Sequence, residues 1–172
     1  MKKILMILLP ISLFVFSCEE EQSEAIPTEV TLWGVVYSVE NTTEINLGGS
    51  GLTGEIPSEI GNLTNLTFLS LGDNQLTGSI PSEIWNLTNL ITLVLSFNQL
   101  TDSIPSEIGN LSSLTYLRLN DNQLIGEIPE SICDLNFFWG YSNFYISNNQ
   151  LCPPYPSCLE DDLGEQDTSN CD

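Results

Sequence analysis

Histidine is missing from this chain, and basic side chains are scarce. The 172 residues carry three Lys and Arg against 23 Asp and Glu, a formal net charge of −20 at pH 7. Without histidine, Ser-His-Asp and Cys-His catalytic arrangements are impossible. Binding to phosphates needs clustered Lys and Arg, so we expect no nucleic-acid partner.

The residue types that are present form no catalytic or metal-binding pattern. No C-x-x-C pair occurs, which makes zinc a weak explanation for the cysteines. Three glutamates recur at one equivalent position, Glu59, Glu83 and Glu107, and predict a solvated stripe. Paired carboxylates act as acid catalysts only in a cleft that separates their pKa values. We therefore expect no enzyme activity, no metal site and no cofactor.

The most prominent feature of the chain is an internal repeat. A 24-residue pattern places Leu, Asn and Ile-Pro at the same positions in three successive units, with Gly before Ile-Pro in two of them. The units are Leu66, Leu69, Leu71, Asn74, Leu76, Gly78, Ile80, Pro81; Leu90, Leu93, Leu95, Asn98, Leu100, Asp102, Ile104, Pro105; and Leu114, Leu117, Leu119, Asn122, Leu124, Gly126, Ile128, Pro129. A fixed period in this range predicts a solenoid, in which each coil packs only on its neighbours.

Each position of the repeat has a physical role. In Leu69-Ser70-Leu71 the alternation points the leucines inward, so each coil supplies one short strand and successive strands stack in parallel. One asparagine follows each strand: Asn74, Asn98, Asn122 and Asn149. A single amide there can donate to and accept from buried backbone groups. The Ile-Pro dipeptides hold the return path extended, and half-turns such as residues 58–60 cross the convex side.

The two end coils depart from the pattern. The first begins at about Val39 and has Ser50 at the asparagine position. The fifth lies 27 rather than 24 residues after the fourth, with three residues inserted around Phe137 to Tyr141. A solenoid needs atypical ends because an exposed apolar face would aggregate.

The repeat L-x-x-L-x-L-x-x-N-x-L-x-G-x-I-P resembles the plant-specific class of leucine-rich repeats, which includes ectodomains of plant receptor kinases and polygalacturonase inhibitors. The segment Trp33-Gly34-Val35-Val36-Tyr37 is similar to the end of the N-terminal cap of that family, and residues 149–158 resemble the closing cap of related bacterial proteins. The resemblance implies an α/β solenoid: a right-handed coil with a parallel β-sheet on its concave face, about five coils and end caps. It assigns residues 30–158 to this domain, and Trp33 is expected to cover the open end of the core.

The N-terminal segment reads as an export signal. Lys2 and Lys3 precede an apolar run from Ile4 to Phe16, which is too short for a bilayer span of about 20 residues. We expect residues 1–17 to be removed and residues 18–29 to form an acidic tether. The mature formal charge is then 1 − 23 = −22.

A cysteine directly follows the apolar run. The sequence Val15-Phe16-Ser17-Cys18 resembles a bacterial lipoprotein signal, which implies that the Cys18 thiol is lipidated. The acidic residues after it look like the surface-export signal of lipoproteins in the Bacteroidetes group. That resemblance implies a cell-envelope protein on the outer membrane, exposed at the surface and attached by its lipid alone. The alternatives are an ordinary secretory signal and a plain solvated tether.

Four other cysteines, an even number in an exported chain, predict two disulfides. The 27-residue offset brings Cys133 next to position 160, near Cys158, and leaves Cys152 several positions away along the coil. Because a bridge needs Cα atoms within about 7 Å, we predict Cys133 with Cys158 and Cys152 with Cys171. The second bridge ties residues 159–172 to the domain as a C-terminal tail.

The outward strand positions form columns on the concave face. The first is Glu44, Phe68, Thr92, Tyr116 and Asn143; the second is Asn46, Ser70, Val94, Arg118 and Tyr145; the third is Gly48, Gly72, Ser96, Asn120 and Ser147. Aromatics and arginine are enriched at binding hot spots. We therefore predict a ligand-binding site at Phe68, Thr92, Val94, Phe97, Tyr116, Arg118 and Tyr145, with Phe97 between Asp73 and Asp121. The alternative is that these side chains only pack on one another across strands.

The sequence thus predicts a non-catalytic binding module that recognises a protein partner through its concave sheet. Two alternatives stay open. The aromatic column could stack on a glycan in an adhesion module, or the domain could inhibit a secreted hydrolase, an analogy that rests on fold alone.

Overall fold

The computed structural model describes residues 27–135, 137, 143–159 and 163–171. The predicted signal (1–17), Cys18 and most of the tether lie outside this part of the chain. Twelve strands and five 3₁₀-helices occur in it. The strands are β1 (Glu29–Leu32), β2 (Val35–Ser38), β3 (Glu44–Asn46), β4 (Thr53–Gly54), β5 (Phe68–Ser70), β6 (Gln75–Ser79), β7 (Thr92–Val94), β8 (Gln99–Thr101), β9 (Tyr116–Arg118), β10 (Ile125–Glu127), β11 (Phe144–Tyr145) and β12 (Gln150–Cys152). The helices are η1 (Ser58–Asn62), η2 (Ser82–Asn86), η3 (Ser106–Asn110), η4 (Glu130–Asp134) and η5 (Ser157–Leu159).

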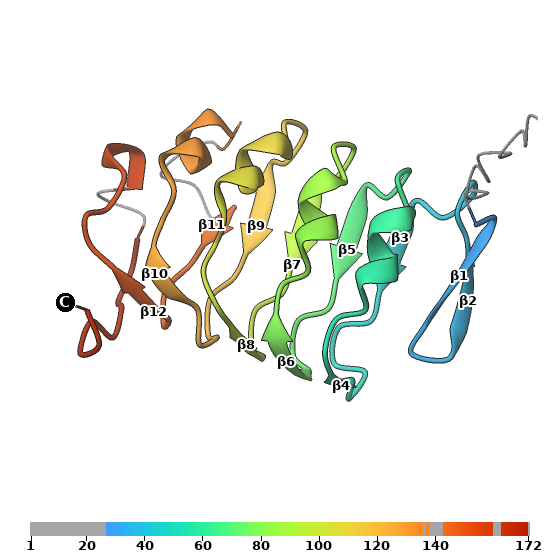
Figure 1. Cartoon of the computed structure of the whole chain (residues 1–172), viewed down its shortest axis with the longest axis horizontal. Helices are drawn as coiled ribbons and strands as arrows, with labels where there is room; N and C mark the ends of the chain where they lie inside the picture. The colour runs from blue at the N-terminus through green and yellow to red at the C-terminus, as the bar shows by residue number, and fades with distance from the viewer. Residues whose placement is uncertain (1–26, 136, 138–142, 160–162, 172) are drawn as a thin grey trace, which may run out of the picture.

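The chain forms the expected solenoid, with coils laid side by side (Figure 1). The main sheet is parallel, in the order β11-β9-β7-β5-β3. Its register follows the repeat: Leu69 pairs with Leu93 and Leu93 with Leu117, one 24-residue step each. Between β9 and β11 the step is 27 residues, since Leu117 pairs with Phe144. Both offsets are those predicted from the sequence.

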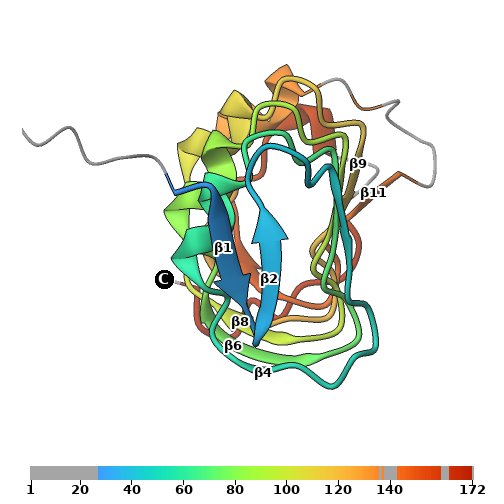
Figure 2. The ribbon, with the colours of Figure 1, turned by 90° about the vertical axis from the view of Figure 1, so that its right-hand side faces the viewer.

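Viewed from the N-terminal end, the coil encloses the core between the main sheet, the row of 3₁₀-helices and short second strands (Figure 2). The helices are 3₁₀ rather than α, and η1 to η4 each begin after a proline in the extended region, as at Pro57 with φ −63° and ψ 134°. The repeat leucines fill the interior; Leu69, Leu93 and Leu117 have no exposed surface. Each buried leucine contributes about 1.5–3 kcal/mol relative to an exposed one.

A second strand in each coil was not expected from the sequence. The strands β4, β6 and β8 pair in one short sheet, and β10 pairs with β12 in another. The break falls where Asp102 takes the place that Gly78 and Gly126 occupy in neighbouring coils. All three residues have positive φ, 67° for Asp102 against 74° and 78° for the glycines. An aspartate side chain tolerates this region less well than glycine does.

The asparagines after the strands join neighbouring coils. The Asn98 amide group donates to the carbonyls of Leu71 in the preceding coil and of Leu95 and Ser96 in its own, at 3.0, 3.1 and 3.3 Å. Its Oδ1 accepts from the backbone N–H of Leu76 in the preceding coil at 3.0 Å. Asn74, Asn122 and Asn149 repeat this arrangement. The predicted role is confirmed, and the bonds also link each coil to the one before.

The N-terminal cap is an antiparallel hairpin of β1 and β2, which lies across the open end of the coil in Figure 2. It begins at Glu29, the last residue assigned to the tether. Val30 and Leu32 are buried against the first coil. Trp33 lies in the hairpin turn at φ 46° and packs against the core while partly buried, as expected for a cap residue.

The C-terminal cap carries both disulfides. Cys133 is bonded to Cys158 with Cα atoms 5.8 Å apart, and Cys152 to Cys171 with Cα atoms 5.6 Å apart. This is the pairing that the coil register predicts. The second bridge fixes the tail, which runs along the fifth coil: the Asn148 N–H donates to the carbonyl of Glu165 at 2.7 Å.

Candidate functional site

The main sheet presents the predicted columns in register on its concave face. Phe68 pairs with Thr92 and Thr92 with Tyr116, which places the first column across β5, β7 and β9. Val94 pairs with Arg118 and Arg118 with Tyr145, which places the second column beside it. Each of these side chains is half-buried, as expected for residues standing on a sheet.

The centre of the site is a stacked arginine. The Arg118 guanidinium carbon lies 4.6 Å from the centroid of the Tyr145 ring and 5.2 Å from that of Tyr116. Both distances are within the range of cation–π attraction. The Nε atom of Arg118 is buried and has no hydrogen-bond partner. The two rings therefore hold a cation in place by its faces and leave hydrogen-bonding capacity unused.

Small residues shape the floor beside Val94. A Cβ atom added to Gly72 would lie 3.1 Å from Val94 Cγ1 and 3.3 Å from the Ser96 carbonyl oxygen. Because Gly72 has no side chain, the Val94 side chain can lie close to the backbone of the second coil. Phe68 and Tyr116 do not pack as a direct pair in this register, because Thr92 stands between them.

Phe97 lies in the turn that follows β7 rather than on a strand. Its φ is 55°, and 51% of the residue is exposed. The equivalent turn residues of the other coils share positive φ: Gly49, Asp73, Asp121 and Asn148. Glycine, asparagine and aspartate tolerate this conformation, whereas a bulky side chain rarely adopts it. An exposed aromatic held there is a candidate for function.

Ile91 belongs to the same surface and was missed from the sequence. It precedes β7 and is 45% exposed. Thr67 and Thr115 hold the equivalent positions in the neighbouring coils. One apolar residue in a column that otherwise holds threonine or serine was the available signal. Ile91, Val94 and Phe97 make the third coil richer in apolar residues at these positions than the coils on either side.

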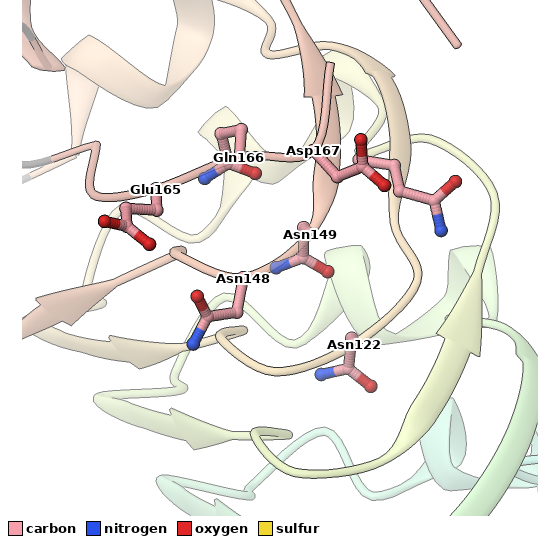
Figure 3. A pocket seen from close by; sticks show the side chains of 7 residues that line it. Asn122, Asn148, Asn149, Glu165, Gln166 and Asp167 are labelled. Carbon is pink, nitrogen blue, oxygen red and sulfur yellow. The ribbon is translucent and has the colours of Figure 1, made fainter. Parts of the chain in front are cut away.

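A polar pocket of about 420 Å³ lies between the last coil and the tail (Figure 3). It is lined by Asn122, Asn148, Asn149, Gln150, Glu165, Gln166 and Asp167. Asn122 and Asn149 are buried, and their amides are already bonded to backbone. The Ser169 hydroxyl and then its backbone N–H, as hydrogen-bond donors, lower the pKa of Asp167 below 3.8. The buried amides serve the fold, so we do not assign this pocket a ligand.

Among the described residues, no group of three or more Cys, Asp or Glu is placed to hold a metal ion. None of the helices in the described ranges has the length and apolar character needed to cross a bilayer.

Family models match the repeat region. A model described as Leucine Rich repeats (2 copies) matches residues 64–103 and 88–133, and one described as Leucine Rich Repeat matches residues 41–63. No curated protein sequence matches the chain significantly.

Solved structures of plant ectodomains are similar in fold and sequence. The chain is 33% identical to a chain of the BIR3 - SERK2 complex from Arabidopsis thaliana, covering 80% of this chain and 72% of that one, with a TM-score of 0.63. It is 32% identical to the BIR2 ectodomain from Arabidopsis thaliana, covering 71% and 66%, with a TM-score of 0.62. For the plant peptide hormone receptor RGFR1 in complex with RGF2, the identity is 38% over 68% of this chain, with a TM-score of 0.58. The chain spans only 22% of that receptor chain.

Proposed function

The chain belongs to the leucine-rich-repeat family, and on that premise we propose that it is a non-catalytic module that binds a protein partner through the concave face of its main sheet. The observation that carries the proposal is Arg118 stacked on Tyr116 and Tyr145. Arginine and tyrosine are the residue types that dominate binding energy at protein interfaces, and stacking fixes the arginine before a partner arrives. The ectodomain of RGFR1 is described with the peptide RGF2 bound, and BIR3 with SERK2.

Pre-organisation supports this assignment. An arginine that is already ordered loses less side-chain entropy on binding than a free one. A partner carboxylate near Arg118 would also gain from the charge of the guanidinium. The half-buried Phe68 and Val94 and the exposed Ile91 supply apolar contact area, with Thr92 between them.

Capture of a partner by the purified full chain tests the proposal. The wild type is compared with a variant carrying Phe68→Ala and Arg118→Ala, and with a control carrying Glu59→Ala and Glu107→Ala on the convex side. We expect the control to recover the same partner as the wild type and the concave variant to lose it. Identical recovery by all three proteins would refute binding through the concave face.

The glycan alternative is weaker on this surface. Arg118 lies against the rings of Tyr116 and Tyr145, so a sugar cannot use those faces as stacking platforms. Saturable binding on a glycan array that is lost in Tyr116→Ala would favour it instead. No feature of the site specifically favours the hydrolase-inhibitor alternative.

We also propose that the protein is a surface-exposed lipoprotein of the outer membrane, anchored through Cys18. The support is the apolar run ending at Ser17-Cys18 and the acidic tract that follows. Labelled palmitate should be incorporated into the full chain in cells of its source organism and not into Cys18→Ala. Equal labelling of both proteins would contradict the anchor.

A further inference from the structure

One row of turn residues runs beside the columns of the concave face. The row consists of Gly49, Asp73, Phe97, Asp121 and Asn148, one residue per coil, all with positive φ. Neighbouring rungs of a parallel sheet lie about 4.8 Å apart. The backbone continues this spacing into the turn, since the N–H of Asp73 donates to Ser96 at 2.9 Å and that of Phe97 to Asn120 at 3.1 Å. Phe97 is thus flanked by a carboxylate on either side.

Within the described ranges, neither carboxylate is paired with a cation. Asp121 accepts hydrogen bonds from the side-chain amides of Asn120 and, at 2.8 Å, of Asn148, which orient it but carry no charge. Asp73 is exposed. The only basic residue in the described part of the chain, Arg118, is stacked on tyrosines instead.

The row therefore combines an exposed aromatic ring with two carboxylates, of which Asp73 is exposed and Asp121 is hydrogen-bonded only to neutral amides. A ring face attracts a Lys or Arg cation within about 6 Å, and carboxylates add charge-assisted hydrogen bonds. The rest of the third coil, with Ile91 and Val94, supplies apolar surface next to the ring. A basic peptide segment with intervening apolar residues matches this surface.

The net charge of the protein indicates which kind of partner this row of turn residues binds. Without residues 1–17 the chain carries 1 − 23 = −22, so a second copy or an acidic partner is repelled and a basic one is steered toward it. Resting on the proposed function, we propose that the partner presents a basic segment that places a Lys or Arg side chain over Phe97, between Asp73 and Asp121.

Binding of defined peptides to the full chain tests this inference. The probes are fluorescein-labelled eight-residue peptides that alternate glycine with lysine, arginine or glutamate, followed by anisotropy at low and at physiological salt. The site variant carries Asp73→Asn and Asp121→Asn, a change that suits positive φ. The matched control carries Glu59→Gln and Glu107→Gln, which removes the same charge from the convex side.

We expect the basic peptides to bind and the glutamate peptide not to. The site variant should bind them about tenfold more weakly, as for the loss of two partly screened ion pairs. Phe97→Leu should weaken binding about fivefold through loss of the cation–π contact. The convex control should change affinity less than about twofold.

Equal weakening of the site variant and the convex control would overturn the inference, because the attraction would then be general to the acidic surface. Failure of the proposed function gives a different result, because the Phe68→Ala, Arg118→Ala variant would then recover the same partner as the wild type. If a captured partner is lost in the Phe68→Ala, Arg118→Ala variant but retained in Asp73→Asn, Asp121→Asn, the concave face binds it and only the basic segment is wrong.

Discussion

Gln166 repeats, one coil further along, the hydrogen bonds that the Asn149 amide donates, although its own side-chain oxygen has no partner in the ranges that the structure describes. Asn149 donates to the carbonyls of Leu119 and Ile146 at 3.0 and 2.9 Å. Gln166 donates to those of Ile146 and Leu163 at 3.1 and 3.2 Å. The tail therefore forms part of a sixth coil that covers the edge of the fifth. In this partial coil, Leu163 holds the position that Ile146 holds in the fifth.

This relationship predicts that the tail stabilises the domain. Replacing Cys152 and Cys171 together by alanine opens a loop with a sequence separation of 19 residues. It should lower the free energy of unfolding by about 3 kcal/mol, because the unfolded chain regains loop entropy. Urea unfolding followed by circular dichroism measures the change. A loss below about 1 kcal/mol would mean that the tail is not part of the cooperative unit.

The asparagine ladder predicts a large cost for one substitution. Asn98→Leu leaves the N–H of Leu76 without its acceptor and removes one of the two bonds to the carbonyl of Leu71, to which Asn74 still donates. At about 1–3 kcal/mol for the unpaired buried N–H and about 1 kcal/mol for the lost bond to Leu71, the free energy of unfolding should fall by about 2–4 kcal/mol. Asn89 makes a matched control, because its side chain is exposed and donates one bond, to Thr64. Asn89→Leu should cost about 1 kcal/mol, and equal losses in the two variants would contradict the ladder.

Phe97 predicts a conflict between stability and binding. Phe97→Gly should raise the free energy of unfolding by about 1 kcal/mol, because glycine adopts the left-handed conformation without the Cβ clash. Thermal unfolding measures the gain, and the same variant should lose affinity for the basic peptides. Phe97→Leu is the control, since it keeps the clash and should give no gain. A destabilised Phe97→Gly would show that the ring packs into the fold rather than serving a partner.

The break in the second sheet predicts that Asp102→Gly is stabilising. Glycine at φ 67° should restore the geometry seen at Gly78 and Gly126 and add about 0.5–1 kcal/mol to the free energy of unfolding. Hydrogen exchange at the amide of Ile125, which donates to the Asp102 carbonyl, should slow. Unchanged exchange and unchanged stability would mean that Asp102 carries no strain.

Most of the fold follows from the sequence because the repeat fixes it. Once Leu69 and Leu93 occupy one position of a 24-residue period, their pairing and the columns beside them are determined. The register also sets the cysteine pairs, since Cys133 and Cys158 fall on neighbouring coils. The second strands were missed because their residues do not alternate between apolar and polar. The partial sixth coil was missed because Gln166 comes 17 residues after Asn149, which does not match the 24-residue period.

The site was only partly predictable, for a different reason. The columns placed Arg118 beside Tyr145, but the position of the guanidinium between two rings depends on side-chain rotation, which register does not determine. The left-handed turn at Phe97 is set by backbone sterics that a phenylalanine in the sequence argues against. Ile91 lies before the strand, where alternation gives no direction to a side chain.

The most direct test of the central claim is site-specific photo-cross-linking in cells of the source organism. A photoreactive phenylalanine analogue replaces Tyr116 on the concave face in one full-length protein and Glu59 on the convex side in another. We predict a discrete cross-linked adduct from position 116 and none from position 59. An adduct from position 59, with none from position 116, would contradict recognition through the concave sheet.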